Sequence, residues 1–519
     1  MTTKKSGCGC LSAIIFLGAL LAAGGYAFSK GWHQLILGTE LTPLEAARVI
    51  PQEVFLTSYI ETEPQNWSET SIPEVNSLVA QFSQEVRESL PPNYQDLDYG
   101  EDISPWLGNG AIAFFPKIAP SFDSPYGLQP DADFLMVFGI ENPLQAYRFK
   151  RTLKSRSIKP QISKFQGITV NKIDCSPGSQ IYFAVLQNKL VVTEKLSIIH
   201  KAIATYQGEP ALADNPETKK VLQQKTGLEN SLVQVYLTNY QQLFEQVLPI
   251  DSMAFTFGHE AKSVKLKTMV NFNTKPELEI PSPEQQPVLA NFPRSTVALV
   301  NGYINAREIS YAWSYLIEDY YPYLSWWFKS DRQLTQVLKI LSNYQDFWQL
   351  IDGEFNWGLA IDETQANSEL DFSTGLILTM SDRQRATQAL KKLEQSYFNS
   401  LMPPNNSIGT PNFNSSWLNQ SNLLLSWNNN ANNLTFKEPQ DSILQNRKFS
   451  NFYTNLPKNN LGYFYLDIEA IVSQIDWSDY GEESNLVMPL LNSIDSLTSN
   501  TTIKTRQKYL ESDIVLKFK

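Results

Sequence analysis

The chain has 519 residues, of which 42% are apolar and 18% charged, and its formal charge is −11. These values exclude a largely disordered chain and a protein with many membrane spans, and the length exceeds what one hydrophobic core normally supports. The acidic balance, with no basic stripe recognised among the aromatic residues, predicts that nucleic acid is not a partner.

The first 30 residues predict a cytoplasmic N-terminus followed by a transmembrane signal anchor. Residues 11–28 are uncharged and apolar, and as a helix they would cover about 27 Å, close to the thickness of the hydrocarbon core. Lys4 and Lys5 precede this run, so the positive-inside tendency keeps that end in the cytoplasm and puts the body across the membrane. A cleaved secretory signal is the alternative, because Gly25-Tyr26-Ala27 would serve as its cleavage site.

After a linker at 31–42, the rest of the chain predicts one unit that occurs twice. Five segments of the first half recur in the same order in the second half, which is typical of a tandem duplication. The matched segments are 50–60 with 292–303, 99–114 with 351–361, 133–155 with 371–396, 231–248 with 460–475, and 255–272 with 501–518. We therefore predict repeat 1 at 43–275, a proline-rich linker at 276–293 and repeat 2 at 294–519.

Within each repeat, strands are predicted to run into capped helices. Asn142 and Pro143 have the residue types that favour the N-cap and first turn of a helix, and Ser381 or Asp382 is expected to cap the equivalent helix. Residues 183–193 predict a hairpin. Because several strands follow one another without a helix, the expected fold class is α+β. An N-terminal single transmembrane helix would precede two tandem homologous domains with largely antiparallel sheets and packed helices, and a doubly wound parallel sheet is the alternative.

The N-terminal anchor, the start at 41–68 (LTPLEAARVIPQEVFLTSYIETEPQNWS) and the duplicated strand and helix pattern resemble an uncharacterised cyanobacterial family. That family is known only as a domain of unknown function and covers nearly the whole chain. The resemblance implies a membrane-tethered protein of the periplasm or thylakoid lumen, and it carries no catalytic motif.

The search for chemistry yields no catalytic, cofactor or metal motif, so we predict no cofactor and no metal. His200 and His259 lie in a helical and a strand-rich stretch and are expected to be structural. The acids Glu101 and Asp102 match Asp352 and Glu354 in the other repeat. Paired acids of this kind could bind calcium or act as acid and base, but their presence in both repeats favours a glycine-centred turn that enters a strand.

One segment is unusually rich in aromatic residues. Residues 320–328 read YYPYLSWWF, and Pro322 would interrupt a helix there, so the rings cannot all face one buried stripe. Exposed Tyr and Trp side chains suit a membrane interface or a protein contact, although extra core packing is the alternative. The predicted partner or lipid-binding residues are Tyr320, Tyr321, Tyr323, Trp326, Trp327 and Phe328.

The sequence therefore predicts a non-catalytic, membrane-tethered module that binds a protein or lipid partner outside the cytoplasm. The alternative is a hydrolase that uses acidic residues in a cleft between the two repeats.

Overall fold

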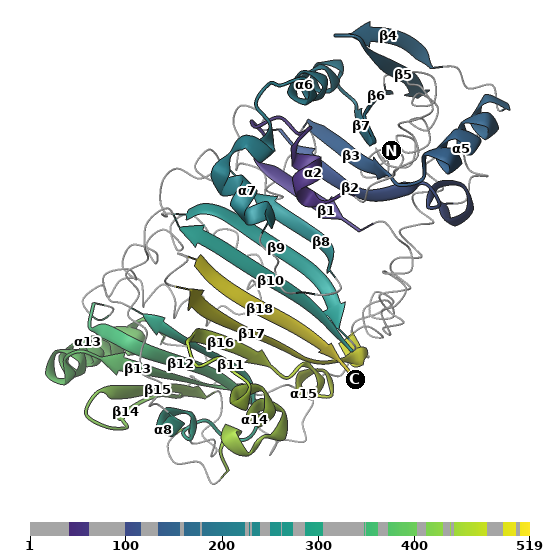
Figure 1. Ribbon diagram of the computed structural model, residues 1–519. Coiled ribbons are helices and arrows are strands. Elements are labelled where there is room, and N and C mark those ends of the chain that lie inside the picture. The colour runs from purple at the N-terminus through teal and green to yellow at the C-terminus, as the bar shows by residue number, and fades with distance from the viewer. Residues whose placement is uncertain are drawn as a thin grey trace, which may run out of the picture. The chain divides into compact units, whose positions relative to one another are not determined.

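Figure 1 shows the computed structural model of the chain. The structure describes residues 41–61, 99–115, 133–155, 160–176, 179–223, 228, 231–238, 250–260, 262–272, 286–304, 347, 349–361, 372–401, 412–428, 436, 441–474, 491–504 and 509–519. The predicted anchor at 1–30 lies outside these residues, as does most of the predicted linker at 31–42.

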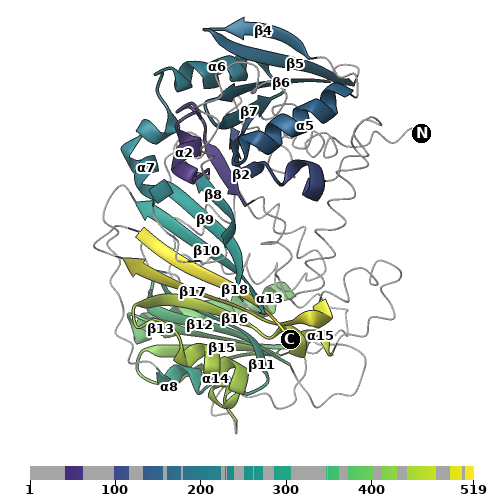
Figure 2. The same ribbon diagram turned by 45° about the vertical axis from the view of Figure 1, so that its right-hand side comes forward.

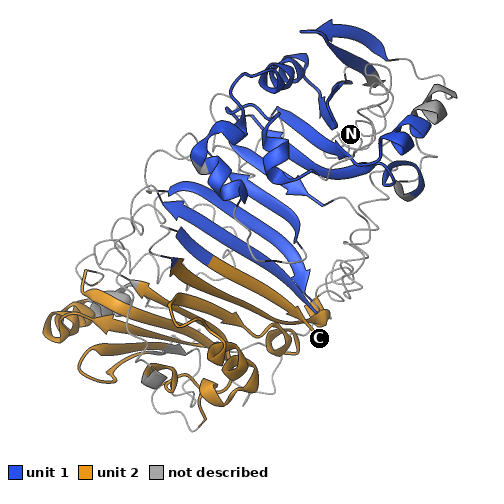
Figure 3. Ribbon diagram, viewed as in Figure 1, with its two compact units in different colours: residues 1–276, 504–511 blue, residues 277–503, 512–519 orange. Residues whose placement is uncertain are grey.

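The chain divides into two compact units (Figure 3). Unit 1 contains residues 1–276 and 504–511, and unit 2 contains residues 277–503 and 512–519. The last strand, β18 (Tyr509–Phe518), therefore contributes residues to each unit. The extents proposed above for the two repeats and their linker stay predictions.

The strands of unit 1 form an antiparallel sheet (Figures 1 and 2). In spatial order they are β4 (Gln161–Phe165), β5 (Ile168–Ser176), β6 (Ser179–Leu186), β7 (Lys189–Thr193), β3 (Phe134–Ile140), β2 (Leu107–Phe114), β1 (Leu56–Ile60), β8 (Ser231–Leu237), β9 (Ile250–Glu260) and β10 (Ser263–Phe272). The first strand of the sequence, β1, is therefore an interior strand, hydrogen-bonded to β2 on one side and to β8 on the other.

The strands of unit 2 are also antiparallel and follow a matching order. From one edge they are β14 (Asn412–Trp417), β15 (Asn422–Asn428), β13 (Phe372–Met380), β12 (Ile351–Ile361), β11 (Thr296–Ile304), β16 (Asn460–Leu466) and β17 (Ile494–Lys504). Again the first strand of the unit, β11, is interior, between β12 and β16. The order from β14 to β17 corresponds to the order from β6 to β9 in unit 1, so β4 and β5 are additional to unit 1 among the described strands.

Equivalent backbone hydrogen bonds hold the entry to the first strand in both units. In unit 1 the backbone N–H of Leu212 donates to the Ile50 carbonyl at 2.8 Å, and in unit 2 the N–H of Ile443 donates to the Phe292 carbonyl at 2.8 Å. Each bond lies beside an isolated β-bridge at a proline, which is Pro51 in unit 1 and Pro293 in unit 2. The two units thus share local geometry as well as strand order.

The described helices are mostly short connections that cover parts of each sheet. Unit 1 contains α2 (Pro43–Ala47), the π-helical turn η3 (Tyr99–Ile103), α5 (Pro143–Ser155), α6 (Leu196–Tyr206), η4 (Leu212–Asp214) and α7 (Pro216–Gln223). Unit 2 contains α8 (Gln286–Leu289), α13 (Arg383–Leu401), η7 (Ile443–Gln445), α14 (Arg447–Thr454) and α15 (Ile468–Val472).

The apolar side of these helices builds the cores. In unit 1, Ile199 and Ile203 of α6 are fully buried in one cluster with Leu135 and Val137 of β3. In unit 2, the fully buried ring of Phe449 in α14 packs against strand β16. A second cluster of unit 2 joins the N-terminal half of α13 to strands β12, β13 and β15. Burial of these apolar faces, rather than helix propensity, stabilises such short helices.

Local signals read from the sequence are confirmed at three places. The side-chain oxygen of Asn142 accepts a hydrogen bond from the Gln145 N–H at 3.1 Å, as expected for the N-cap of α5. Asp382 accepts one from the Arg385 N–H at 3.0 Å and so caps α13. Strands β6 and β7 form the predicted hairpin, and Gln187 in its turn has a φ of 61°.

The predicted α+β fold class is wrong. The described chain is mostly antiparallel sheet, whereas the expectation was an N-terminal transmembrane helix followed by two tandem α+β domains with largely antiparallel sheets and packed helices. Strands such as β9 and β12 have 11 residues each, but the helices α7 and α14 have only 8. The strand-to-helix signals were correct for α5 and α13, with 13 and 19 residues, but they did not show that other connecting helices are much shorter. Within the described ranges, no helix is both long and apolar enough to cross a bilayer.

Candidate functional site

The predicted aromatic binding segment lies outside the described residues. This holds for all of its named members: Tyr320, Tyr321, Tyr323, Trp326, Trp327 and Phe328. Among the described residues, the sequence had marked the paired acids and two histidines, but not the charged cluster of unit 2.

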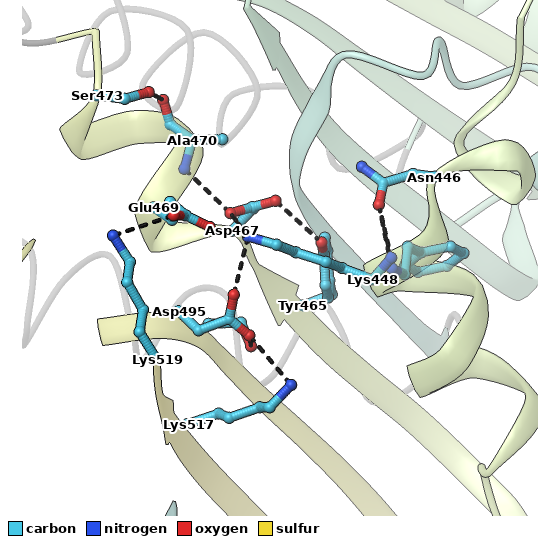
Figure 4. Close-up of polar contacts among 12 residues, drawn as sticks. Asn446, Lys448, Tyr465, Asp467, Glu469, Ala470, Ser473, Asp495, Lys517 and Lys519 are labelled. Atoms are coloured by element: carbon cyan, nitrogen blue, oxygen red, sulfur yellow. Dashed lines mark hydrogen bonds and ion pairs between the residues drawn. The ribbon is translucent and has the colours of Figure 1, made fainter. Parts of the chain in front are cut away.

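Six charged side chains converge in unit 2 (Figure 4), and we call them the Lys448 cluster. They are Lys448 in α14, Asp467 at the N-cap of α15, Glu469 in α15, Asp495 in β17, Lys517 in β18 and Lys519 directly after it. Lys448 Nζ lies 2.7 Å from a carboxylate oxygen of Glu469, 2.9 Å from one of Asp495 and 3.0 Å from one of Asp467. Lys517 pairs with Asp495 at 3.3 Å, and Lys519 pairs with Glu469 at 3.1 Å.

Local caps position the two helices that meet in this cluster. Asn446 accepts hydrogen bonds from the backbone N–H groups of Lys448 and Phe449 at 3.0 and 3.3 Å, which starts α14. Asp467 accepts one from the Ala470 N–H at 3.0 Å, which starts α15. The backbone N–H of Asp467 also donates to the Val297 carbonyl at 2.7 Å, so the cluster is attached to the strand at the centre of the unit.

The charges in the Lys448 cluster stabilise one another. Burial alone would lower the pKa of Lys448, but hydrogen bonds to Glu469, Asp495 and Asp467 together raise it. Hydrogen bonds from Lys448 and Lys519 lower the pKa of Glu469. Burial opposes the ionised form of Asp495, yet its bonds to Lys448 and Lys517 lower the pKa of that carboxyl as well. A lysine held as a cation is a poor nucleophile, so this arrangement favours structural cohesion over covalent catalysis.

Unit 1 has no equivalent of this cluster at the matching position among its described residues. Where Asp467 follows β16, Thr238 follows β8, and its backbone N–H donates to the Phe55 carbonyl at 2.9 Å. The Thr238 hydroxyl lies 3.4 Å from the Val54 carbonyl. The backbone contact is therefore common to both units, but the charged side chains are particular to unit 2.

Glu354 in strand β12 is a partly buried carboxylate with two amide neighbours. Its Oε1 accepts hydrogen bonds from Asn301 Nδ2 at 2.6 Å and from Asn356 Nδ2 at 3.3 Å. Burial raises the pKa of Glu354, although both amide bonds act in the opposite direction. A raised pKa is a property of general acids, so Glu354 is a described residue that would suit the hydrolase alternative.

The other acids of the predicted pairs occupy different local structures. Glu101 and Asp102 lie in the π-helical turn η3, ahead of strand β2, whereas Asp352 lies within β12 and is exposed. Gly353 has a φ of 136°, a conformation that favours glycine. No group of three or more His, Cys, Asp or Glu side chains suited to a metal occurs in the described ranges.

Both histidines examined in the sequence pack into the structure of unit 1. The ring of His200 stacks on Phe165, with 3.8 Å between ring centres, and burial lowers the pKa of His200. His259 is buried within β9. The His200 contact fastens the β4–β5 hairpin to helix α6, and a hydrogen bond of 2.8 Å from Gln207 to the Gln166 carbonyl acts at the same place.

A groove of about 440 Å³ lies on unit 1 beside α6. It is lined by Pro51, Gln52, Glu53, Lys201, Thr205, Glu209 and Pro210. Lys201 forms an ion pair with Glu53 and lies 5.8 Å from the centre of the Phe115 ring. With one lysine neutralised and two glutamates present, the groove carries no positive charge for an anionic ligand.

Unit 1 also exposes large apolar side chains on ordered elements. Leu144 in α5 is 55% exposed, Ile162 in β4 is 69% exposed and Leu196 in α6 is 41% exposed. These are the large hydrophobic residues that stand out as exposed in the described part of the chain, and all three belong to unit 1. Contiguous exposed apolar groups are typical of surfaces that contact a partner, whereas single ones are common on any protein surface.

We predict that Lys448→Met destabilises unit 2 by roughly 1–3 kcal/mol at pH 7, because three carboxylates are left without their shared cation. The lowered pKa values of Glu469 and Asp495 mean that the parent loses stability as pH falls through their folded pKa values. As the pH falls over that range, the free energy of unfolding of the variant should decrease less than that of the parent, or increase. Urea unfolding from pH 3 to pH 7 measures the difference, and a constant difference across this range would contradict the electrostatic explanation.

We predict that Glu354→Gln raises the stability of the protein at pH 7 by up to about 1 kcal/mol. The raised pKa of Glu354 means that its ionised form costs stability above the unfolded pKa, while glutamine keeps an oxygen acceptor for both asparagines. The gain should vanish near pH 4, where Glu354 is protonated. Thermal melts at the two pH values test this, and an equal or larger gain at pH 4 would refute it.

Comparison with known proteins identifies a family but no activity. No curated protein matches the sequence. Among solved structures, two crystal forms of TP0453 are similar: form IV with 15% identity over 44% of this chain and 80% of that one, and form I with 14% identity over 47% and 83%. Their TM-scores are 0.25 and 0.26. Residues 10–518 match the family described as "Protein of unknown function (DUF3352)", and the chain belongs to that family.

Proposed function

We propose that the protein is a non-catalytic module, tethered to a membrane through its N-terminal apolar run, that binds a protein or lipid partner at the extracytoplasmic face. The observation that carries this proposal is the set of exposed apolar side chains on α5, β4 and α6 of unit 1. Buried contacts hold these elements in place, so the exposed side chains are presented on an ordered backbone.

The anchoring of these elements supports a binding surface over an incidental one. In α5, Ala146 and Phe149 are buried, and the Phe149 ring stacks on Trp106 with 5.6 Å between ring centres. Opposite these contacts, Leu144 remains exposed. A partner can therefore bury apolar area there without first ordering the helix, which lowers the entropic cost of binding.

The charge pattern of the described residues also supports a binding module over an enzyme. The strongest assembly of ionic groups, the Lys448 cluster, is satisfied internally and holds its lysine as a cation. Such a cluster stabilises a platform more readily than it activates a substrate.

We also propose a cyanobacterial origin for the protein, with its body in the periplasm or thylakoid lumen. The lysines ahead of residues 11–28 support this orientation. Protease added from the extracytoplasmic side should degrade the body, and a reporter fused after Lys519 should be active only on that side. Cytoplasmic activity of the reporter would refute the proposal.

The hydrolase remains a second proposal, and the raised pKa of Glu354 is the observation that favours it. A change at Glu354 distinguishes the hydrolase proposal from the binding proposal. Glu354→Gln would remove an acid or base but leave the exposed surface of unit 1 unchanged.

The binding proposal is tested by replacing the exposed apolar residues with polar ones. We expect Leu144→Ser with Ile162→Ser to reduce partner recovery at least several-fold in affinity capture from solubilised membranes, because both side chains are exposed. The melting temperature should stay near that of the parent, since neither side chain lies in the core.

A second variant, Trp326→Ala with Trp327→Ala, tests the predicted aromatic segment in the same assay. Reduced recovery with an unchanged melting temperature would support its role in binding. A matched control, Thr387→Ser on the exposed part of α13, should change neither quantity. Unchanged recovery in both experimental variants would refute the proposed binding surface.

A further inference from the structure

The acidic chain contains one long segment with the opposite charge. Between Pro143 and Ile173 there are eight basic residues and no acidic residue, although the whole chain has 42 basic and 53 acidic ones. This segment comprises α5, β4 and most of β5. It escapes a search for a basic stripe because its basic residues are interspersed with neutral ones.

Helix α5 separates its apolar and basic positions. Ala146 and Phe149 face the core, while Leu144 and Arg148, four residues apart, are exposed. Residues four apart are neighbours on one side of a helix. The solvent side of α5 therefore combines an apolar residue with an arginine.

Strand β4 continues the same chemistry. Ile162 and Lys164 are both exposed and, being two residues apart, project from the same side of the strand. Among the described strands only β5 pairs with β4, which leaves β4 at the edge of the unit 1 sheet. The hairpin is held by its tip, where His200 stacks on Phe165, so the exposed side is presented on a fixed support.

The described part of unit 2 lacks this combination. Its described strands include no equivalent of β4 and β5, and the β14–β15 hairpin, residues 412–428, contains no charged residue. Helix α13 does carry exposed basic residues, Arg385, Lys391 and Lys392. No exposed large hydrophobic residue accompanies them among the described positions of that helix. Unit 2 thus offers a matched basic helix without the apolar companions.

We propose that the exposed side of α5 and strand β4, with Leu144, Arg148, Ile162 and Lys164, binds the anionic headgroups of a lipid surface. This inference rests on the proposed function, because it assigns a lipid rather than a protein to the binding surface. Arginine and lysine pair with phosphate oxygens, and the two apolar side chains enter the boundary between headgroups and acyl chains.

Charge complementarity favours a lipid surface over nucleic acid. A membrane meets one face of the body, so the acidic remainder of the chain stays away from it. The formal charge of the whole chain is −11, which disfavours a polynucleotide that extends beyond the basic segment. The exposed leucine and isoleucine also have no partner in a phosphate backbone, but they match the acyl boundary.

The test uses the full chain in nanodiscs of phosphatidylcholine, which occupy its N-terminal apolar run. These are mixed with sucrose-loaded vesicles of phosphatidylcholine alone or of phosphatidylcholine with about 30% phosphatidylglycerol, an anionic lipid. Co-sedimentation of the protein with the vesicles is then measured. Empty nanodiscs give the background. We expect sedimentation only with the anionic vesicles, and release of the protein at high salt.

Two variants with the same change of charge locate the surface. The double change Arg148→Gln and Lys164→Gln should reduce partition onto anionic vesicles roughly 30-fold. The control, Arg385→Gln and Lys391→Gln on α13, should retain most of it. Circular dichroism melts verify that both variants fold as the parent does.

Three other outcomes would overturn the proposed lipid-binding surface. Equal losses in the two variants would show a general charge effect and overturn the assignment to α5 and β4. Absence of binding to anionic vesicles, or tighter binding to a duplex DNA oligonucleotide than to them, would overturn the lipid assignment. If vesicle binding is absent while affinity capture still recovers a protein through Leu144 and Ile162, the proposed function stands and only this inference fails.

Discussion

The placement of the first strand of each unit at the interior of its sheet is the constraint on which the rest of the structure depends. Strand β1 pairs with β2 and β8, so Leu56 lies opposite both Phe114 and Leu237. Strand β11 pairs with β12 and β16 in the same way. Such long-range antiparallel pairing requires nearly the whole unit to be present before the central ladder is complete.

The sites follow from that arrangement. Because β16 lies beside β11, the residue that follows β16 reaches the Val297 carbonyl, and this residue is Asp467. Its carboxylate then caps α15 and meets Lys448 from α14. In unit 1 the same backbone position is filled by Thr238, so the shared ladder supports an ionic cluster in one unit and a neutral contact in the other.

The two units differ in how they use charge. In unit 2, lysines and carboxylates of the Lys448 cluster neutralise each other at distances between 2.7 and 3.3 Å. In unit 1, the segment from Pro143 to Ile173 keeps its positive charge without acidic neighbours in sequence, and exposed apolar residues lie within it. This contrast favours different roles for the two units. The described charges of unit 2 stabilise its fold, whereas the described surface of unit 1 is suited to contact a partner.

The sequence by itself determined the local features and the family. The caps at Asn142 and Asp382 and the β6–β7 turn depend on hydrogen bonds between residues a few positions apart, so residue type and spacing suffice to predict them. The charge of the segment from Pro143 to Ile173 was also present in the sequence, and a windowed charge count would have found it. Only the tertiary structure decided that the fold is mostly sheet, and only it assembled the Lys448 cluster. The members of that cluster come from residues 448 to 519, and no spacing marks them as neighbours. They meet because strand pairing, a long-range interaction between backbone groups, brings α14, α15 and the last strands together.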